Sequence, residues 1–122
     1  MIALMDVHYR DSPTGTQAHA ACVLASDWQA AKPARQVSLT LTEVAEYQPG
    51  EFYRRELPCL LQLLKQLPTP PSLLVIDGYV WLDDADRPGL GAHLYKALGQ
   101  CIGVIGIAKT AFVGVNQCQR IA

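Results

Sequence analysis

Two patterns of apolar residues divide the chain into strands and helices. Residues 72–80 (SLLVIDGYV) carry consecutive apolar side chains up to Asp77, and residues 102–108 (IGVIGIA) are similarly apolar. A strand with one face in water alternates apolar and polar side chains, so these runs predict strands buried on both faces, as at the centre of a sheet covered by helices. Residues 1–9, which are apolar up to Asp6, predict another central strand.

Turn residues and alternation place two further strands. Residues 11–15 (DSPTG) have the composition of a turn, so the strand expected at 16–26 should pair with the first strand as an antiparallel hairpin. Residues 36–44 alternate with a period of two, which is typical of an edge or half-exposed strand. The first three strands are therefore expected to form a meander.

Apolar spacing predicts two helices. In residues 52–67 the apolar side chains recur at intervals of three and four, the period of a helix. Pro58 lies inside this segment, so the helix either begins near Leu57, with the proline in its first turn, or kinks at Pro58. Residues 90–98 predict a shorter helix that Gly99 caps.

The order of these elements predicts an α/β fold. Three strands in a meander, followed by strands alternating with crossover helices, give a mixed five-stranded sheet with helices on both faces. The first and fourth strands would be neighbours at its centre. The length of 122 residues allows one domain, residues 1–122, and the 50% hydrophobic content excludes a disordered chain.

Charge and cysteine content narrow the function and the environment. A formal net charge of −1 argues against a high-affinity, non-specific nucleic-acid binder, although a metal-dependent nuclease can recruit phosphate through its ions. None of the four cysteines lies in a C-x-x-C pair, so we expect reduced, structural thiols and a cytoplasmic protein. Asp6 comes too early for a secretory signal, and no apolar run reaches the length of a membrane span.

Two aspartates end the central strands. Asp77 follows the doubly buried run, and Asp6 interrupts the first strand. If these strands are parallel neighbours, the two carboxylates lie side by side at the edge where α/β sheets bind ligands. Hard oxygen ligands on separate rigid strands suit a divalent cation. Taken alone, Asp6 also fits an ordinary strand-end or turn aspartate.

Four sequence blocks match one family in order. They are Asp6 with Val7, residues 47–58 (YQPGEFYRRELP), residues 75–78 (VIDG) and residues 105–109 (IGIAK). The second block is similar to the pattern Tyr-x-Pro-Gly-x-x-x-x-Arg-Glu-x-Pro and is specific, whereas the other three are weak singly. Together with the order of elements, the blocks resemble endonuclease V, the deoxyinosine-directed 3′-endonuclease family, which has a ribonuclease H-like fold.

The resemblance implies a metal site and a catalytic lysine. Asp6, Glu56 and Asp77 would be the Mg²⁺-binding carboxylates, with Mn²⁺ as an alternative ion, and Lys109 would lie near the scissile phosphate. Without the resemblance, Glu56 reads as a first-turn helix acid with local ion pairs. Lys109 would then be an ordinary strand-end lysine.

The resemblance also implies residues that bind the substrate. Tyr47 would belong to a wedge that separates the strands beside the lesion, and Pro49 and Gly50 would shape that wedge. The alternative for Tyr47 is packing on the helix that follows it.

Two features depart from the family pattern and leave two hypotheses. Residues 77–80 read DGYV, as some shorter bacterial relatives do, where the family usually has Asp-Gly-His-Gly. Ala122 comes before the family's C-terminal strand and helix.

The resemblance implies a Mg²⁺-dependent endonuclease of the DNA repair type. It would hydrolyse a phosphodiester bond near a deaminated base, inosine, in DNA rather than RNA. The alternative is a non-catalytic ribonuclease H-like module that binds nucleic acid or protein.

Overall fold

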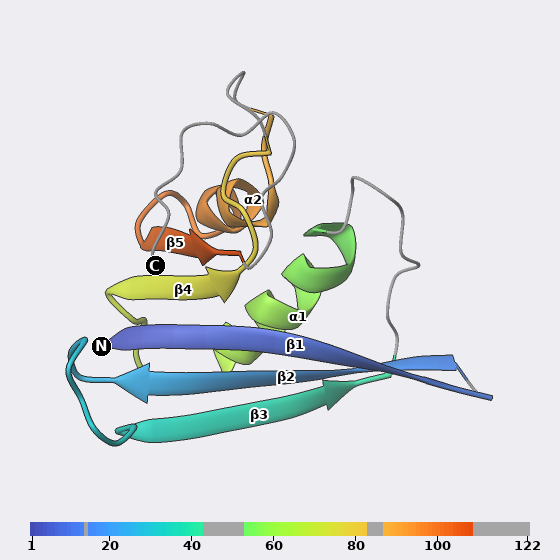
Figure 1. Cartoon of the computed structure of the whole chain (residues 1–122), viewed down its shortest axis with the longest axis horizontal. Coiled ribbons are helices and arrows are strands. Elements are labelled where there is room, and N and C mark those ends of the chain that lie inside the picture. Colours follow the sequence, from blue (N-terminus) through green and yellow to red (C-terminus); the bar gives the residue numbers. More distant parts are fainter. Residues whose placement is uncertain (14, 43–52, 83–86, 109–122) are drawn as a thin grey trace.

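Five strands and two helices make up the described part of the chain (Figure 1). The computed structural model describes residues 1–13, 15–42, 53–82 and 87–108. In chain order the elements are β1 (Ile2–Ser12), β2 (Gly15–Ala25), β3 (Arg35–Leu41), α1 (Tyr53–Lys65), β4 (Leu73–Asp77), α2 (Leu90–Ala97) and β5 (Gly103–Ile107). The strands form one sheet in the order β3-β2-β1-β4-β5.

Strand β1 joins the antiparallel and parallel parts of the sheet. It pairs antiparallel with β2 along its whole length and parallel with β4, where Met5 lies opposite Ile76. On the outer sides, β3 is antiparallel to β2 and β5 is parallel to β4. The predicted mixed five-stranded sheet, its meander and its central parallel pair are therefore confirmed.

Alternating side chains of β1 build one side of the core. Ala3, Met5 and Val7 are buried in one cluster with leucines from both helices, of which Leu63 in α1 and Leu94 in α2 have no exposed surface. Side chains between these β1 positions point to the other face, because successive residues of a strand alternate. The core therefore lies between the sheet and the two helices.

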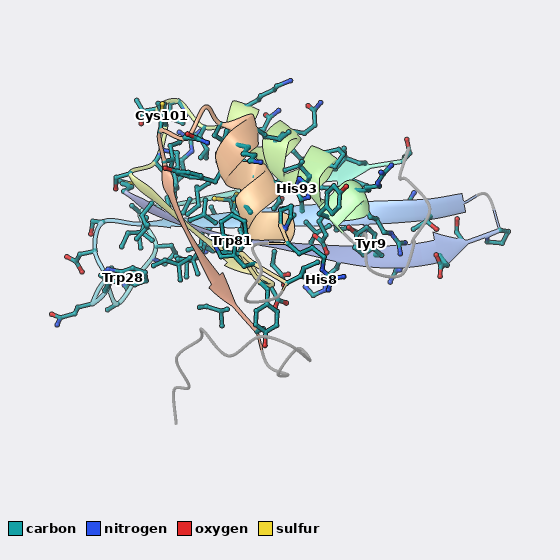
Figure 2. All side chains as sticks on the ribbon, turned by 90° about the horizontal axis from the view of Figure 1, so that it is seen from above. His8, Tyr9, Trp28, Trp81, His93 and Cys101 are labelled. Carbon is teal, nitrogen blue, oxygen red and sulfur yellow. The ribbon has the colours of Figure 1, made fainter. Side chains whose placement is uncertain are left out.

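Both helices lie on the same face of the sheet (Figure 2). The prediction of helices on both faces is not met by the described residues. Crossovers between parallel strands are right-handed, so the direction of the crossover along the sheet decides which face its helix covers. The crossovers from β3 to β4 and from β4 to β5 run in the same direction through the strand order, and handedness places α1 and α2 on the same side.

Helix α1 begins five residues before Pro58. It spans Tyr53–Lys65 with the proline inside, which excludes one of the two predicted alternatives, the start near Leu57. Proline has no N–H and cannot donate the helical hydrogen bond to the Arg54 carbonyl. The earlier start places Glu56 in the first turn, where the exposed N–H groups of a helix favour an acidic side chain.

Only one of the two strands predicted to be doubly buried is buried on both faces. Val75 and Ile76 of β4 point to opposite faces and are 5% and 2% exposed. In β5, by contrast, Ile105 is 40% exposed and Ile107 54%, so that prediction was wrong for the described chain. The reason is that β5 is an edge strand whose isoleucines lie on the face without helices.

The structure also bears on two expectations about the environment. Three of the four cysteines lie in the described part of the chain. Cys22 and Cys59 are buried, Cys101 is exposed, and these three are free thiols. Burial raises the pKa of the Cys22 and Cys59 thiols, which agrees with a structural role for these two. Neither of the helices that the structure describes is long and apolar enough to cross a membrane.

Candidate metal-binding site

Asp6 and Asp77 directly follow Met5 and Ile76, the last residues through which β1 and β4 pair with each other. Met5 and Ile76 lie opposite each other in the register, so the next residues, Asp6 and Asp77, reach the same edge of the sheet. Met5 and Ile76 are buried beneath the helices, and both aspartates are exposed. The sheet therefore places two carboxylates on adjacent strands at its carboxyl edge.

Both oxygens of the Asp6 carboxylate have a neighbouring donor. Oδ1 accepts a hydrogen bond of 2.9 Å from the Val7 N–H, and Oδ2 lies 3.2 Å from His8 Nε2. The second contact is an ion pair when His8 is protonated. A cation that binds Asp6 would therefore compete with protonated His8 for one carboxylate oxygen.

Glu56 is the buried member of the acidic group. It is 9% exposed, and its pKa is raised from 4.5 to about 7. Burial is the largest cause, because it penalises the charged form, and the negative charges of Asp6 and Asp77 raise the pKa further. Helix α1 thus carries a third carboxyl group close enough to Asp6 and Asp77 to be repelled by both.

Tyr9 and Arg55 form a small cluster beside Glu56. The Arg55 guanidinium carbon lies 3.9 Å from the centre of the Tyr9 ring, a cation–π contact. Both residues lower the pKa of Glu56, but burial and the charges of the two aspartates raise this pKa by more. Burial, and then the charge of Glu56, raise the pKa of the Tyr9 hydroxyl.

Two polar atoms of this cluster are buried without ordinary hydrogen-bond geometry. Tyr9 Oη and Arg55 Nε have no hydrogen-bond partner of that kind within the described part of the chain. The Tyr9 hydroxyl still lies close enough to the Glu56 carboxyl group to lower the pKa of Glu56 by hydrogen bonding. Neither residue was predicted from the sequence as part of the site. Arg55 belongs to the specific block and precedes Glu56, which was a usable signal, whereas nothing in the sequence singled out Tyr9.

The acidic group has the chemistry of a magnesium site but not its geometry. Among the described residues, no three Asp, Glu, His or Cys side chains are close enough to hold a metal ion together. The donor set nevertheless fits Mg²⁺, because it consists of hard oxygens and carries an excess of negative charge that a cation would relieve. Binding would require the carboxylate side chains to turn toward one another.

Four of the predicted site residues lie outside the described residues. They are Tyr47, Pro49, Gly50 and Lys109. Their roles stay predictions from the sequence resemblance.

Two glycines shape the segment that follows Asp77. Gly78 has φ of +144°, and its N–H donates a hydrogen bond of 2.8 Å to the Ile107 carbonyl of β5. A Cβ atom on Gly106 would collide with the Gly78 carbonyl oxygen. The role of Gly106 was not predicted from the sequence, although a glycine inside a strand often marks a close approach of two backbones.

Replacing Gly106 with Ala should therefore disturb the end of β4. We expect a loss of about 1–3 kcal/mol in the free energy of unfolding, because the added methyl group overpacks a backbone contact. Urea unfolding measures this loss. The matched control is Gly103→Ala, whose Cβ would lie 3.2 Å from the Leu73 Cδ1 atom, the mobile end of a side chain. Equal stability of the two variants would contradict the proposed backbone contact.

Known structures share this fold. The crystal structure of Bacillus subtilis endonuclease V superimposes with a TM-score of 0.76 at 24% identity, over 99% of this chain and 49% of that chain. Ciona intestinalis endonuclease V, in complex with a 24-mer DNA containing an inosine followed by a ribo-adenosine, gives a TM-score of 0.70 at 20% identity, over 90% of this chain and 47% of that chain. These likenesses confirm the ribonuclease H-like α/β fold.

Sequence comparison covers nearly the whole chain. The endonuclease V of Xylella fastidiosa is 34% identical over 114 residues, which is 93% of this chain and 45% of the relative. The chain thus spans about half the length of this curated relative. A sequence model described as Endonuclease V matches residues 1–121. This chain therefore belongs to the endonuclease V family.

Proposed function

We propose that this chain carries the metal-binding part of an endonuclease that hydrolyses a phosphodiester bond of nucleic acid near a deaminated base. Asp6, Glu56 and Asp77 would hold Mg²⁺, or Mn²⁺ in its place. The observation that supports this assignment is the raised pKa of Glu56, which both aspartates increase although they lie 50 and 21 positions away in the sequence. A bound cation would relieve the repulsion among these three carboxylates.

Each residue of the proposed site has a separate task. Asp6 presents its carboxylate from within β1, where the pairing with β4 ends, and Asp77 presents its carboxylate from the last residue of β4. Glu56 adds a third from the first turn of α1. Arg55 and Tyr9 hold the first turn of this helix against β1, which positions Glu56. When bound, Mg²⁺ would supply positive charge to the phosphate oxygens and lower the pKa of a water molecule.

The proposed substrate is DNA that contains inosine. The support is the membership in the endonuclease V family and the inosine-containing DNA bound by the Ciona intestinalis enzyme. The formal net charge of −1 agrees with recruitment of phosphate through a bound ion rather than through a basic surface.

One observation favours a second candidate function. The described carboxylates are not gathered into a coordination shell, which is what a non-catalytic ribonuclease H-like module that binds nucleic acid or protein would show. The two candidates differ in whether the folded chain binds a divalent cation.

Thermal unfolding with and without Mg²⁺ separates the two candidates. An ion that binds only the folded state should stabilise it by about 2.7 kcal/mol at a concentration of 100 times its Kd, or roughly 5 °C or more in Tm. We expect this shift for the unmodified chain in Mg²⁺ relative to EDTA. The shift should disappear in Asp77→Asn and in Glu56→Gln.

The matched control for this experiment is Asp11→Asn. Asp11 lies on the same strand as Asp6 but near its far end, where its Oδ1 accepts a hydrogen bond of 2.7 Å from the Thr16 hydroxyl, and asparagine can keep that bond. This variant should respond to Mg²⁺ like the unmodified chain. A chain that Mg²⁺ does not stabilise, or a shift that survives Asp77→Asn, would favour the non-catalytic module.

A further inference from the structure

Two aromatic rings from different helices stack face to face. The Tyr53 ring comes from the first turn of α1, and the His93 ring comes from α2, on the side that faces α1 (Figure 2). The ring centroids lie 3.6 Å apart and the ring planes differ by 15°. We call this pair the Tyr53–His93 stack. It is a direct side-chain contact between the two helices.

The stack lies one helical turn before Glu56. Tyr53 and Glu56 are three residues apart on α1, and residues at this spacing lie on the same face of a helix. The first turn of a helix is weakly held, because its N–H groups lack partners within the helix. Pro58 weakens this turn further, since it cannot donate a hydrogen bond to the Arg54 carbonyl. A contact at Tyr53 therefore supports the turn from which Glu56 projects.

Helix α2 is bound to the segment that follows Asp77. The Val80 carbonyl oxygen accepts hydrogen bonds of 2.8 Å from the Gly89 N–H and 3.3 Å from the Ala92 N–H. Gly91 packs so closely on the same residue that a Cβ atom there would lie 2.8 Å from the Val80 Cα atom. Asp77 precedes Val80 by three residues. The position of α2 is therefore tied to the strand that ends in Asp77.

Glu56 is thus held from two directions. Its neighbour Arg55 contacts the Tyr9 ring of β1, the strand that also carries Asp6. The stack makes the corresponding contact with α2, which is bound to the segment after Asp77. Together the two contacts fix the first turn of α1 relative to both aspartates.

His93 takes part in the stack as an uncharged ring. Burial lowers the pKa of the imidazole, and the positive charges of Lys96 and Arg54 lower it further. The neutral ring is therefore favoured at neutral pH, and a phenyl ring can take its place in a stacked contact. A role as metal ligand would instead require an imidazole nitrogen. A phenylalanine substitution therefore distinguishes packing from ligation.

We propose that Tyr53 and His93 are positioning residues of the metal site. Their stack holds the first turn of α1 against α2, and so keeps the Glu56 carboxyl group at the distance from Asp77 that a shared cation needs. The inference rests on the proposed function, because it concerns the same site. Mg²⁺ demands near-ideal octahedral geometry, so contacts that orient its ligands contribute to the affinity without touching the ion.

The affinity for Mg²⁺ measures this positioning. In isothermal titration calorimetry, Tyr53→Ala and His93→Ala should each raise the Kd for Mg²⁺ by about tenfold or more. His93→Phe keeps a ring for stacking, so its Kd should lie within about twofold of that of the unmodified chain. Tyr95→Ala removes an exposed ring from the same helix, outside the stack, and should leave the Kd unchanged.

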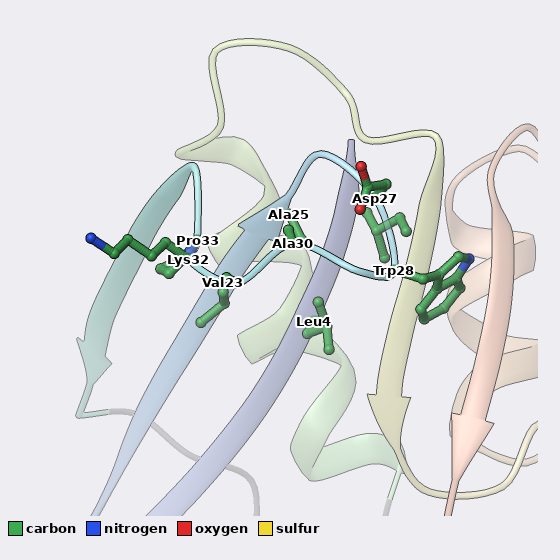
Figure 3. Close-up of a pocket in the computed structure, with 10 residues that line it drawn as sticks. Leu4, Val23, Ala25, Asp27, Trp28, Ala30, Lys32 and Pro33 are labelled. Carbon is green, nitrogen blue, oxygen red and sulfur yellow. The ribbon is translucent and has the colours of Figure 1, made fainter.

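A second control removes a ring far from the acidic group. Trp28 is 63% exposed and lines a groove of about 250 Å³ at the end of the sheet where β1 begins (Figure 3). The acidic group lies beyond Met5, where the pairing of β1 with β4 ends. Trp28→Ala should therefore bind Mg²⁺ like the unmodified chain, which separates loss of the stack from loss of any exposed aromatic ring.

Hydrogen exchange in EDTA measures the support of α1 without a metal. In a helix that begins at Tyr53, the Leu57 N–H bonds to the Tyr53 carbonyl, so its exchange rate reports opening of the first turn. Read by NMR, this rate should rise about threefold to tenfold in Tyr53→Ala and in His93→Ala. The double variant should exchange no faster than either single variant, because both remove the same contact. The Ile76 N–H of β4 is the control and should keep its rate.

Three outcomes would overturn the proposal. The first is an unchanged Mg²⁺ affinity in both alanine variants. The second is a His93→Phe variant that binds as weakly as His93→Ala, which would make the imidazole itself a ligand. The third is equal acceleration of exchange at Leu57 and Ile76, which would mean that the substitutions destabilise the whole fold. An unmodified chain that binds no Mg²⁺ would instead reject the proposed metal site, and exchange at Leu57 would then decide whether the stack holds α1.

Discussion

Asp77→Asn should reduce Mg²⁺-dependent cleavage of inosine-containing DNA by about 100-fold or more, because it removes one of the proposed ligands of the ion. Asp77 is the last residue of β4 and is exposed, so the isosteric change should leave the fold intact. Its charge also raises the pKa of Glu56, and the variant should therefore ionise Glu56 more readily without recovering activity. A labelled duplex with one inosine, incubated with Mg²⁺ and separated on a denaturing gel, measures the cleavage rate.

The controls for this prediction separate the chemistry from the fold. Asp11→Asn should cleave at the unmodified rate, the same duplex without inosine should be cut much more slowly, and EDTA should stop the reaction. Cleavage that persists in Asp77→Asn would reject the nuclease assignment.

Glu56→Gln should remove a pH dependence of stability from the metal-free protein. The pKa of Glu56 in the folded chain, about 7, lies above the ordinary value of 4.5, so the folded state holds this proton more tightly than the unfolded state. The resulting stability is present in full below pH 4.5 and is lost as the pH rises through 7. The loss amounts to roughly 3 kcal/mol at most, from the linkage between pKa and folding free energy. Glutamine stays neutral and should not show it.

Urea unfolding in EDTA between pH 5 and pH 8.5 tests this prediction. The free energy of unfolding of the unmodified chain, minus that of Glu56→Gln, should fall by about 2 kcal/mol across this range. Saturating Mg²⁺ should shrink the fall, because a bound cation favours the carboxylate. A difference that does not change with pH would mean that the pKa of Glu56 is not raised in the folded chain. Asp11→Asn again serves as the control.

Most of the fold could be predicted from apolar patterns, and the errors have identifiable causes. The spacing of leucines located α1, but it could not decide between a start near Leu57 and a helix that contains Pro58, and the structure has the second. Apolar runs located β4 and β5. The run in β5 could not show that its isoleucines lie on the face that no described helix covers. The prediction of helices on both faces was not met by the described residues, although strand order and crossover handedness place α1 and α2 on the same face.

The candidate site was only partly visible in the sequence. Asp6 and Asp77 could be paired from the expected parallel strands, and Glu56 was found through the resemblance to a family. Tyr9 could not be found in this way, because its proximity to Arg55 and Glu56 depends on how α1 packs on β1. Gly106 is similar, since only the path of the chain after Asp77 explains why a side chain is excluded there.

The sequence by itself determined the order of the elements, the mixed sheet and the family, because apolar periodicity and short motifs are local properties of the chain. The tertiary structure decided how strongly Glu56 is protonated, since that depends on burial and on two charges from distant strands. It also decided that Leu4, Val23 and Ile105 are exposed on the mixed sheet, because exposure depends on which layers pack on a face and not on the strand's own pattern.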